Sequence, residues 1–256
     1  MVGTAEVTDI KTRKVMTVPA VSRYSKKQVK RITRKVNKAR ASRALNKVFN
    51  GFTSKSPFPP VKAYKLKYSG VHIMSVGAVG VLGTIQKYNL NSLFDCDNTG
   101  GGHQPYGFDA LAVPYNRYKV NGVRVTIKID DPSIDAMAIN WLLTNPSNAS
   151  ETIAGLSPYQ VKEKTMGGGF TINNSGSQHR QVSFYLPMWK VAGVTALQFK
   201  ADPDNYTGPV TADPGNLCQL QLAIADLRGG SSGTCLFQIE LTYYATLYQR
   251  KVMATS

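Results

Sequence analysis

The chain has 256 residues, and 42% of them are apolar, which supports a folded core and excludes a fully disordered protein. Its net charge of +16 lies in the first quarter: residues 1–67 hold 18 Lys and Arg and two acids, whereas residues 68–256 hold 13 of each sign. A neutral body with a basic N-terminal arm predicts a polyanionic partner at the arm. Three widely spaced cysteines lack the pattern of a disulfide scaffold, so reduced thiols and an intracellular protein are expected.

Residues 1–53 are predicted to form a nucleic-acid-binding arm that is disordered or partly helical. Val29, Ile32 and Val36 recur at helical spacing, but like charges such as Arg31 and Lys35 oppose a free helix until phosphates neutralise them. Few aromatic side chains are present, so the contact is expected to be ionic and independent of sequence. A solvated tail or a nuclear localisation signal is the alternative interpretation. The residues expected to contact nucleic acid are the Lys and Arg residues of this arm: Lys11, Arg13, Lys14, Arg23, Lys26, Lys27, Lys30, Arg31, Arg34, Lys35, Lys38, Arg40, Arg43 and Lys47.

Three further segments follow the arm. Residues 54–62 are rich in proline and are predicted to be an extended hinge. Residues 63–251 are predicted to be the folded domain, and residues 252–256 a C-terminal tail. Alternating or continuous apolar patterns predict strands at 63–75, 83–90, 117–129, 137–144, 159–166, 179–186, 217–227 and 234–248, with short helices at 187–194 and 109–118.

The segment 117–129 gives the clearest strand pattern, because apolar residues at 123, 125, 127 and 129 alternate with polar ones. Asn121 and Gly122 within it could form a hairpin turn, although a bulge in one long strand is preferred. Eight alternating strands with long connections predict an all-β, antiparallel sandwich, and an eight-stranded single jelly roll is the commonest such arrangement. The uncharged stretch 68–86 is short and interrupted by polar residues, so no membrane insertion is expected.

The stretch SLFDCDNTGGGHQPYGFD, residues 92–109, has the residue types of a metal or catalytic site. Cys96 and His103 lie on a glycine-rich loop that would position a nucleophile poorly. Asp95 and Asp97 match the start of a calcium loop, but the twelfth position is Tyr106 rather than Glu. We therefore expect no enzyme, no cofactor and no metal, while calcium shared between subunits stays open.

Several motifs together resemble one family. The basic arm with its Pro-rich hinge, NSLFDCDNTGGGHQPYGFD, YNRYKVNGVRVTIKI and the C-terminal IELTYYATLYQRK occur in order between residues 20 and 251. This arrangement resembles the capsid protein of circular Rep-encoding single-stranded DNA (CRESS-DNA) viruses, the circovirus-like group. Cys96 is a departure, because the family often has Pro there.

The resemblance implies a single jelly roll that self-assembles into a small icosahedral T=1 shell of sixty copies and packages single-stranded DNA through the arm. It implies location in the virion, and in the host nucleus during infection, with a host receptor of unknown identity. Candidate subunit contacts are Asp95, Asp97, His103 and Trp189. Two alternatives stay open: the coat of a small positive-strand RNA virus with the same fold, and a cellular β-sandwich binding module with a basic tail.

Overall fold

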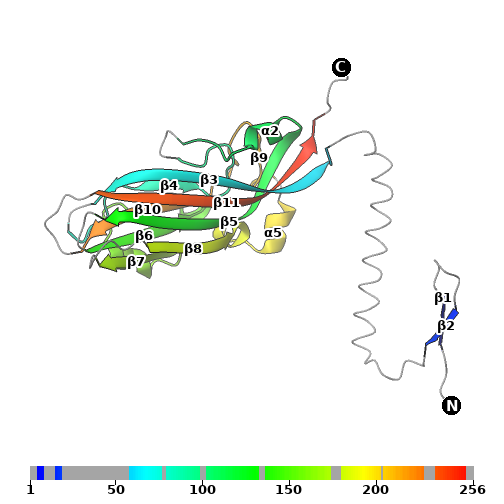
Figure 1. The fold of residues 1–256 in the computed structure, drawn as a ribbon, viewed down its shortest axis with the longest axis horizontal. Helices are drawn as coiled ribbons and strands as arrows, with labels where there is room; N and C mark the ends of the chain where they lie inside the picture. Colours follow the sequence, from blue (N-terminus) through cyan, green and yellow to red (C-terminus); the bar gives the residue numbers. More distant parts are fainter. Residues whose placement is uncertain are drawn as a thin grey trace, which may run out of the picture. The chain divides into compact units, whose positions relative to one another are not determined.

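The computed structural model describes residues 5–8, 15–18, 58–76, 79–98, 102–132, 136–173, 180–202, 204–227 and 234–251 (Figure 1). The chain divides into two units, Met1–Pro57 and Phe58–Ser256. In the first unit, strands β1 (Ala5–Thr8) and β2 (Val15–Val18) pair antiparallel. This small hairpin was not predicted, and the expected helix within residues 23–47 lies outside the described residues.

The second unit is built from two antiparallel sheets, one of five strands and one of four (Figure 1). One sheet has the order β3-β11-β5-β8, and the other has the order β4-β10-β6-β7. A two-residue strand, β9 (Gly208–Pro209), also pairs with β5. The bounds of the main strands are β3 Val61–Ser75, β4 Gln86–Asn89, β5 Tyr115–Pro132, β6 Ala136–Thr144, β7 Gly167–Asn173, β8 Arg180–Pro187, β10 Gln219–Asp226 and β11 Thr234–Arg250.

The strand order confirms the predicted jelly roll. The first long strand, β3, pairs with the last, β11, and the short β4 pairs with the next-to-last, β10. Of the remaining strands, β5 and β8 lie in the first sheet, and β6 and β7 pair with each other in the second, so the chain wraps around the sandwich as in two Greek keys. The connection between any two strands that follow each other across the sheets lies at an end of the sandwich, where loops and short helices gather (Figure 1).

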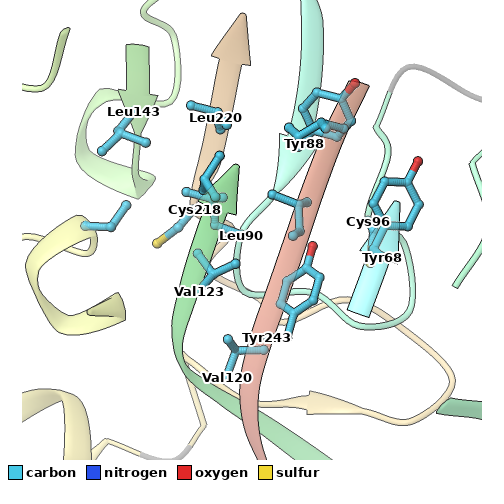
Figure 2. Close-up of a cluster of buried hydrophobic side chains, with 14 of the residues drawn as sticks. Tyr68, Tyr88, Leu90, Cys96, Val120, Val123, Leu143, Cys218, Leu220 and Tyr243 are labelled. Carbon is cyan, nitrogen blue, oxygen red and sulfur yellow. The ribbon is translucent and has the colours of Figure 1, made fainter. Parts of the chain in front are cut away.

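The core lies between the two sheets. Figure 2 shows Val123 of β5 and Tyr243 of β11 on one side of it, with Leu143 and Leu220 of the other sheet opposite. The predicted inward residues of β5, at 123, 125, 127 and 129, are all buried. The Tyr243 hydroxyl donates a hydrogen bond of 2.8 Å to the carbonyl of Asn89, so a polar contact joins the sheets inside the apolar layer.

The preferred interpretation of Asn121 and Gly122 is confirmed. Tyr244 of β11 lies opposite Gly122, whereas the next residue, Ala245, lies opposite Val120. Asn121 is therefore the extra residue of a bulge, and β5 continues through it as one strand.

The predicted strand at 159–166 is wrong. The structure has helix α3 (Pro158–Glu163) there, because Ser157 caps it and Gln160 completes a capping box, with Pro158 in the first helical turn. The expected helix at 109–118 is shorter, since α2 spans Phe108–Ala112 and β5 begins at Tyr115. The helix expected at 187–194 is present as α4 (Met188–Val191).

In the second unit, the sequence analysis also missed α5 (Ala196–Ala201), the 3-10 turn Pro146–Asn148, strand β7 and the two-residue strand β9. Strand β7 begins with three glycines, which have low strand propensity. A Cβ atom on Gly168 would lie 2.6 Å from the Trp141 ring, so close packing of β6 on β7 requires glycine here. No helix among the described residues is long and apolar enough to cross a membrane.

Candidate nucleic-acid interface and subunit contacts

The arm that was predicted to bind nucleic acid is the least described part of the chain. All fourteen of its candidate Lys and Arg residues lie outside the described residues. Their role stays a prediction from composition and charge.

The loop between β4 and α2 lies along the outer edge of strand β3. β3 is an edge strand of its sheet, and such an edge exposes unpaired backbone groups. The Tyr106 N–H donates to the Lys67 carbonyl at 3.3 Å, and His103 Nε2 lies 3.1 Å from the Ser69 carbonyl oxygen. The two carbonyls are two residues apart, so the loop occupies positions that a neighbouring strand would take.

Asp97 anchors this loop to the subunit interior. Its side chain is 4% exposed, and Oδ2 accepts a hydrogen bond of 3.4 Å from the Tyr68 hydroxyl. His72 Nε2 lies 3.4 Å from the same oxygen. The His103 ring packs on Tyr68 with ring centroids 4.8 Å apart. The structure thus brings together Asp97 and His103, two of the four predicted contact residues, through Tyr68.

Asp95 lies beside Asp97 and is half-buried. Burial raises the pKa of its carboxyl, and the nearby carboxylates of Asp213 and Asp97 raise it further. Asp213 accepts a short hydrogen bond from the Ser92 hydroxyl, and that hydroxyl also accepts the backbone N–H groups of Phe94 and Asp95. These contacts hold the turn in which Asp95 lies.

The thiol of Cys96 is buried, and this burial raises its pKa to about 12. A nucleophilic cysteine needs the opposite shift, toward the thiolate, so this environment does not suit catalysis. Among the described residues, no group of three His, Cys, Asp or Glu side chains is arranged to hold a metal ion. Loop residues 99–101, which include part of the calcium-like pattern, lie outside the described residues.

Trp189 lies elsewhere, beside a pocket between β5, β11 and α5. The pocket has a volume of about 340 Å³. Its lining residues are Lys119, Asn121, Trp189, Ala196, Phe199, Lys200, Thr246 and Tyr248. The indole is half-buried, and the Lys190 ammonium lies 5.4 Å from its ring centroid. The structure therefore places Trp189 apart from the three predicted loop residues, at a site of its own.

The sequence analysis missed a cationic surface on the body. The outer face of the β3-β11-β5-β8 sheet carries Lys65 and Lys67 on β3 and Arg124 and Lys128 on β5, with Glu240 between them on β11. Lys65 and Lys67 were counted with the basic segment 1–67, so the charge balance of residues 68–256 did not reveal this face. Alternation along each strand was the available signal. Lys65 and Lys67 are two residues apart and so lie on the same face of β3, and Arg124 and Lys128 are four residues apart and so lie on the same face of β5.

No protein-family model and no curated protein matches the sequence. Solved structures of viral capsid proteins are similar to it. They include turnip yellow mosaic virus (13% identity, TM-score 0.40, 78% of this chain and 87% of the other covered) and the decameric BFDV capsid protein (11%, 0.39, 74% and 99%). A third is the giant freshwater prawn Macrobrachium rosenbergii nodavirus semi-empty VLP (9% identity, TM-score 0.39, 78% of this chain and 100% of the other covered). At these identities the likeness concerns the fold, and a function for this chain depends on its own residues.

Proposed function

We propose that this chain is a viral capsid protein whose copies assemble into a shell around single-stranded nucleic acid. The observation that carries the proposal is the division of charge: the jelly-roll unit 58–256 has a net charge of only +3, whereas residues 1–57 have a net charge of +13. A nearly neutral body lets subunits approach one another closely, and the basic arm attracts a polyanion. The protein is a structural component of the virion on this proposal, and it has no catalytic role.

The charge of the arms couples assembly to genome binding. In a T=1 shell of sixty copies, the N-terminal segments 1–57, each of net +13, would bring about 780 positive charges into one particle. Such a concentration of like charge opposes compaction unless a polyanion neutralises it. Nucleic acid is therefore a partner in assembly as well as the cargo.

Single-stranded DNA is the proposed cargo. The motifs in residues 92–109 and 115–129 support it, because they are similar to those of CRESS-DNA virus capsids. The arm also suits import into a host nucleus, because clustered Lys and Arg serve both import and genome binding. Nuclease digestion of disrupted native particles tests this point: loss of the nucleic acid to DNase supports DNA, and loss to RNase supports the RNA-virus alternative.

Subunit contacts at Asp95, Asp97, His103 and Trp189 remain part of the proposal. Because Asp97 is buried, its contribution to a contact would be indirect, through the loop that it holds. His103 is exposed and Trp189 is half-buried, so these two side chains are accessible to a neighbouring copy.

A charge-neutral arm tests the proposed function. The full-length variant replaces the 11 Lys and Arg of residues 23–47 with Gln and leaves Lys11, Arg13 and Lys14. If all fourteen cations meet single-stranded phosphates, the slope of log K against log salt is roughly −10, and three remaining contacts give about −2, at about 0.7 per contact. The measurement is fluorescence anisotropy of a labelled oligonucleotide across a salt series. An unchanged slope would show that the arm does not hold nucleic acid.

A further inference from the structure

We propose that the body has a second site for single-stranded nucleic acid, made by the outer face of the β3-β11-β5-β8 sheet and the pocket beside Trp189. The pocket takes one unpaired base, and the cations of the face take the neighbouring phosphates. The proposal rests on the proposed function for its ligand class. It places this second binding site on the folded body, in addition to the binding proposed for the arm.

The sheet face is an open cationic surface. Among the side chains that the structure describes on this face, Lys65, Lys67, Arg124 and Lys128 stand against the carboxylate of Glu240, which gives a local charge of +3. The Lys128 ammonium donates to Glu240, and Lys67 lies 3.9 Å from the same carboxylate. Lys65 and Arg124 have no ion-pair partner among the described residues, and Arg124 is exposed. Phosphates are the partners that such unpaired cations attract.

Two tyrosines form an aromatic surface in the middle of this face. Tyr185 of β8 is 49% exposed, and its ring packs edge-on against Tyr244 of β11 with centroids 5.7 Å apart. Tyr185 lies directly over Gly122, where a Cβ atom would be 2.2 Å from the tyrosine hydroxyl oxygen. The Lys65 ammonium lies 6.0 Å from the Tyr244 centroid. Exposed rings beside cations are the elements with which proteins bind unpaired bases and their backbone.

The pocket lies next to the tyrosines, since Asn121 on its wall precedes Gly122 in β5. Three aromatic side chains, Trp189, Phe199 and Tyr248, line it, and its volume is within the range of small-molecule sites, about 300–1,000 Å³. Aromatic walls suit the faces of a planar base.

Polar groups accompany the aromatic walls of the pocket. The Asn121 side chain donates to Thr246 Oγ1 at 2.8 Å, and both residues line the pocket. The Tyr248 hydroxyl is buried without a hydrogen-bond partner among the described residues. Lys200 is exposed at the pocket, whereas the Lys119 ammonium is already used by the Phe199 carbonyl. A base with polar edges and an adjacent phosphate fits this set better than an apolar side chain does.

A second copy of the chain is the competing occupant. Symmetric pairing of this face with itself would oppose two surfaces of like charge, which disfavours contact. A polyanion is the occupant that the charge favours, and the test below separates the two.

The chain contains two tryptophans, so Trp189 can report on its own pocket. In a full-length Trp141→Phe variant, Trp189 is the only tryptophan, and phenylalanine retains a ring against Phe184, whose centroid lies 5.3 Å from that of Trp141. Emission is measured while oligo(dT) of about twelve nucleotides, within the usual site size, is added. Inorganic polyphosphate of similar charge is the control ligand for oligo(dT), since it binds cationic side chains but has no bases. The expected result is quenching by oligo(dT) and little change with polyphosphate.

Substitutions locate the binding on the face. Tyr185→Ala is expected to weaken oligo(dT) binding at high salt about fivefold or more, the loss of one stacked base. Tyr159→Ala is the matched control, because Tyr159 is also an exposed tyrosine and lies on α3, which packs on the other sheet. The double variant Lys65→Gln, Arg124→Gln is expected to reduce the slope of log K against log salt by about 1.4, at about 0.7 per contact. Lys162→Gln on α3 is the control, since it shows the effect of removing one cation away from this face.

Each outcome decides between the two proposals. If anisotropy shows oligo(dT) binding while Trp189 emission responds to oligo(dT) and polyphosphate alike, this site is refuted and the arm-based function stands. A change in emission that depends on protein concentration without ligand shows that a second copy covers the pocket, which also refutes it. Absence of oligo(dT) binding by any part of the chain refutes the proposed function itself.

Discussion

Two aspartates that are two residues apart in the loop beside β3 are expected to affect stability in opposite directions. The pKa of Asp95 is raised, first by burial and then by Asp213 and Asp97. A carboxyl with a raised pKa in the folded state binds its proton more tightly there, so its contribution to stability is present below the unfolded pKa and is lost as pH rises through the folded pKa. Asp95→Asn removes this unfavourable charge and should stabilise the protein at neutral pH.

Asp97→Ala, in contrast, should destabilise the folded protein. The substitution removes the acceptor of the Tyr68 hydroxyl, 3.4 Å away, and the neighbour of His72. Tyr68 is buried, and an unsatisfied buried hydroxyl costs about 1–3 kcal/mol. The loss should therefore be about 1–3 kcal/mol in the free energy of unfolding, with loosening of the loop over the β3 edge.

The assay is urea unfolding of the full-length chain at neutral pH and near pH 4, followed by tryptophan emission. The gain from Asp95→Asn should be largest at neutral pH and should vanish near the unfolded pKa of about 4. Asp109→Asn, at an exposed acid on α2, is the control and should change little. The prediction is refuted if Asp95→Asn and Asp97→Ala change the free energy of unfolding in the same direction at neutral pH, because the Asp95 carboxylate would then not differ from the Asp97 carboxylate that anchors the loop.

Three further predictions concern the sandwich. Gly168→Val should cost about 1–3 kcal/mol or prevent folding, because its Cβ would lie 2.6 Å from the Trp141 ring, whereas Gly215→Val, where nothing lies within 4 Å, should be tolerated in the same unfolding assay. Tyr243→Phe should lower the free energy of unfolding by about 1–3 kcal/mol, since the Asn89 carbonyl loses its donor inside the core; a neutral effect in urea titrations would contradict this. Ser157→Ala should lower the free energy of unfolding by about 1 kcal/mol, because α3 loses its N-cap. Thermal unfolding of this variant, compared with that of Thr152→Ala, checks the prediction.

The jelly roll could be predicted because strand alternation is a local pattern. The inward residues of β5 at 123, 125, 127 and 129 are apolar and the outward ones polar, so one wet and one dry face follow from the residues themselves. Pairing order is not local, and alternation alone left the topology undetermined. The bulge at Asn121 likewise became certain only from the shift of register against β11.

Two errors in the strand prediction have different physical causes. β7 was missed because Gly167, Gly168 and Gly169 have low strand propensity, although the close approach of Trp141 requires glycine at 168. The segment 159–166 has apolar residues at mixed spacing, and the capping residues Ser157 and Gln160 were the unused evidence for helix α3.

The candidate site was only partly accessible from sequence. From the spacing of its residues, catalysis was not expected of segment 92–109, and this stays a prediction. The contact of this segment with the β3 edge depends on strand order, which the sequence pattern does not give. The cationic sheet face was missed because its cations come from two strands, β3 and β5, that are distant in sequence. Lys65 and Lys67 were counted with the basic segment 1–67, so the excess on this face did not show in the charge balance of residues 68–256.

Assembly into a nucleic-acid-filled shell can be observed by size-exclusion chromatography and negative-stain electron microscopy of the full-length protein, followed by nuclease protection. A capsid protein is expected to form megadalton, closed particles that protect nucleic acid from added nuclease. A monomer or small oligomer that persists across salt and pH, with and without added single-stranded DNA, would contradict this expectation.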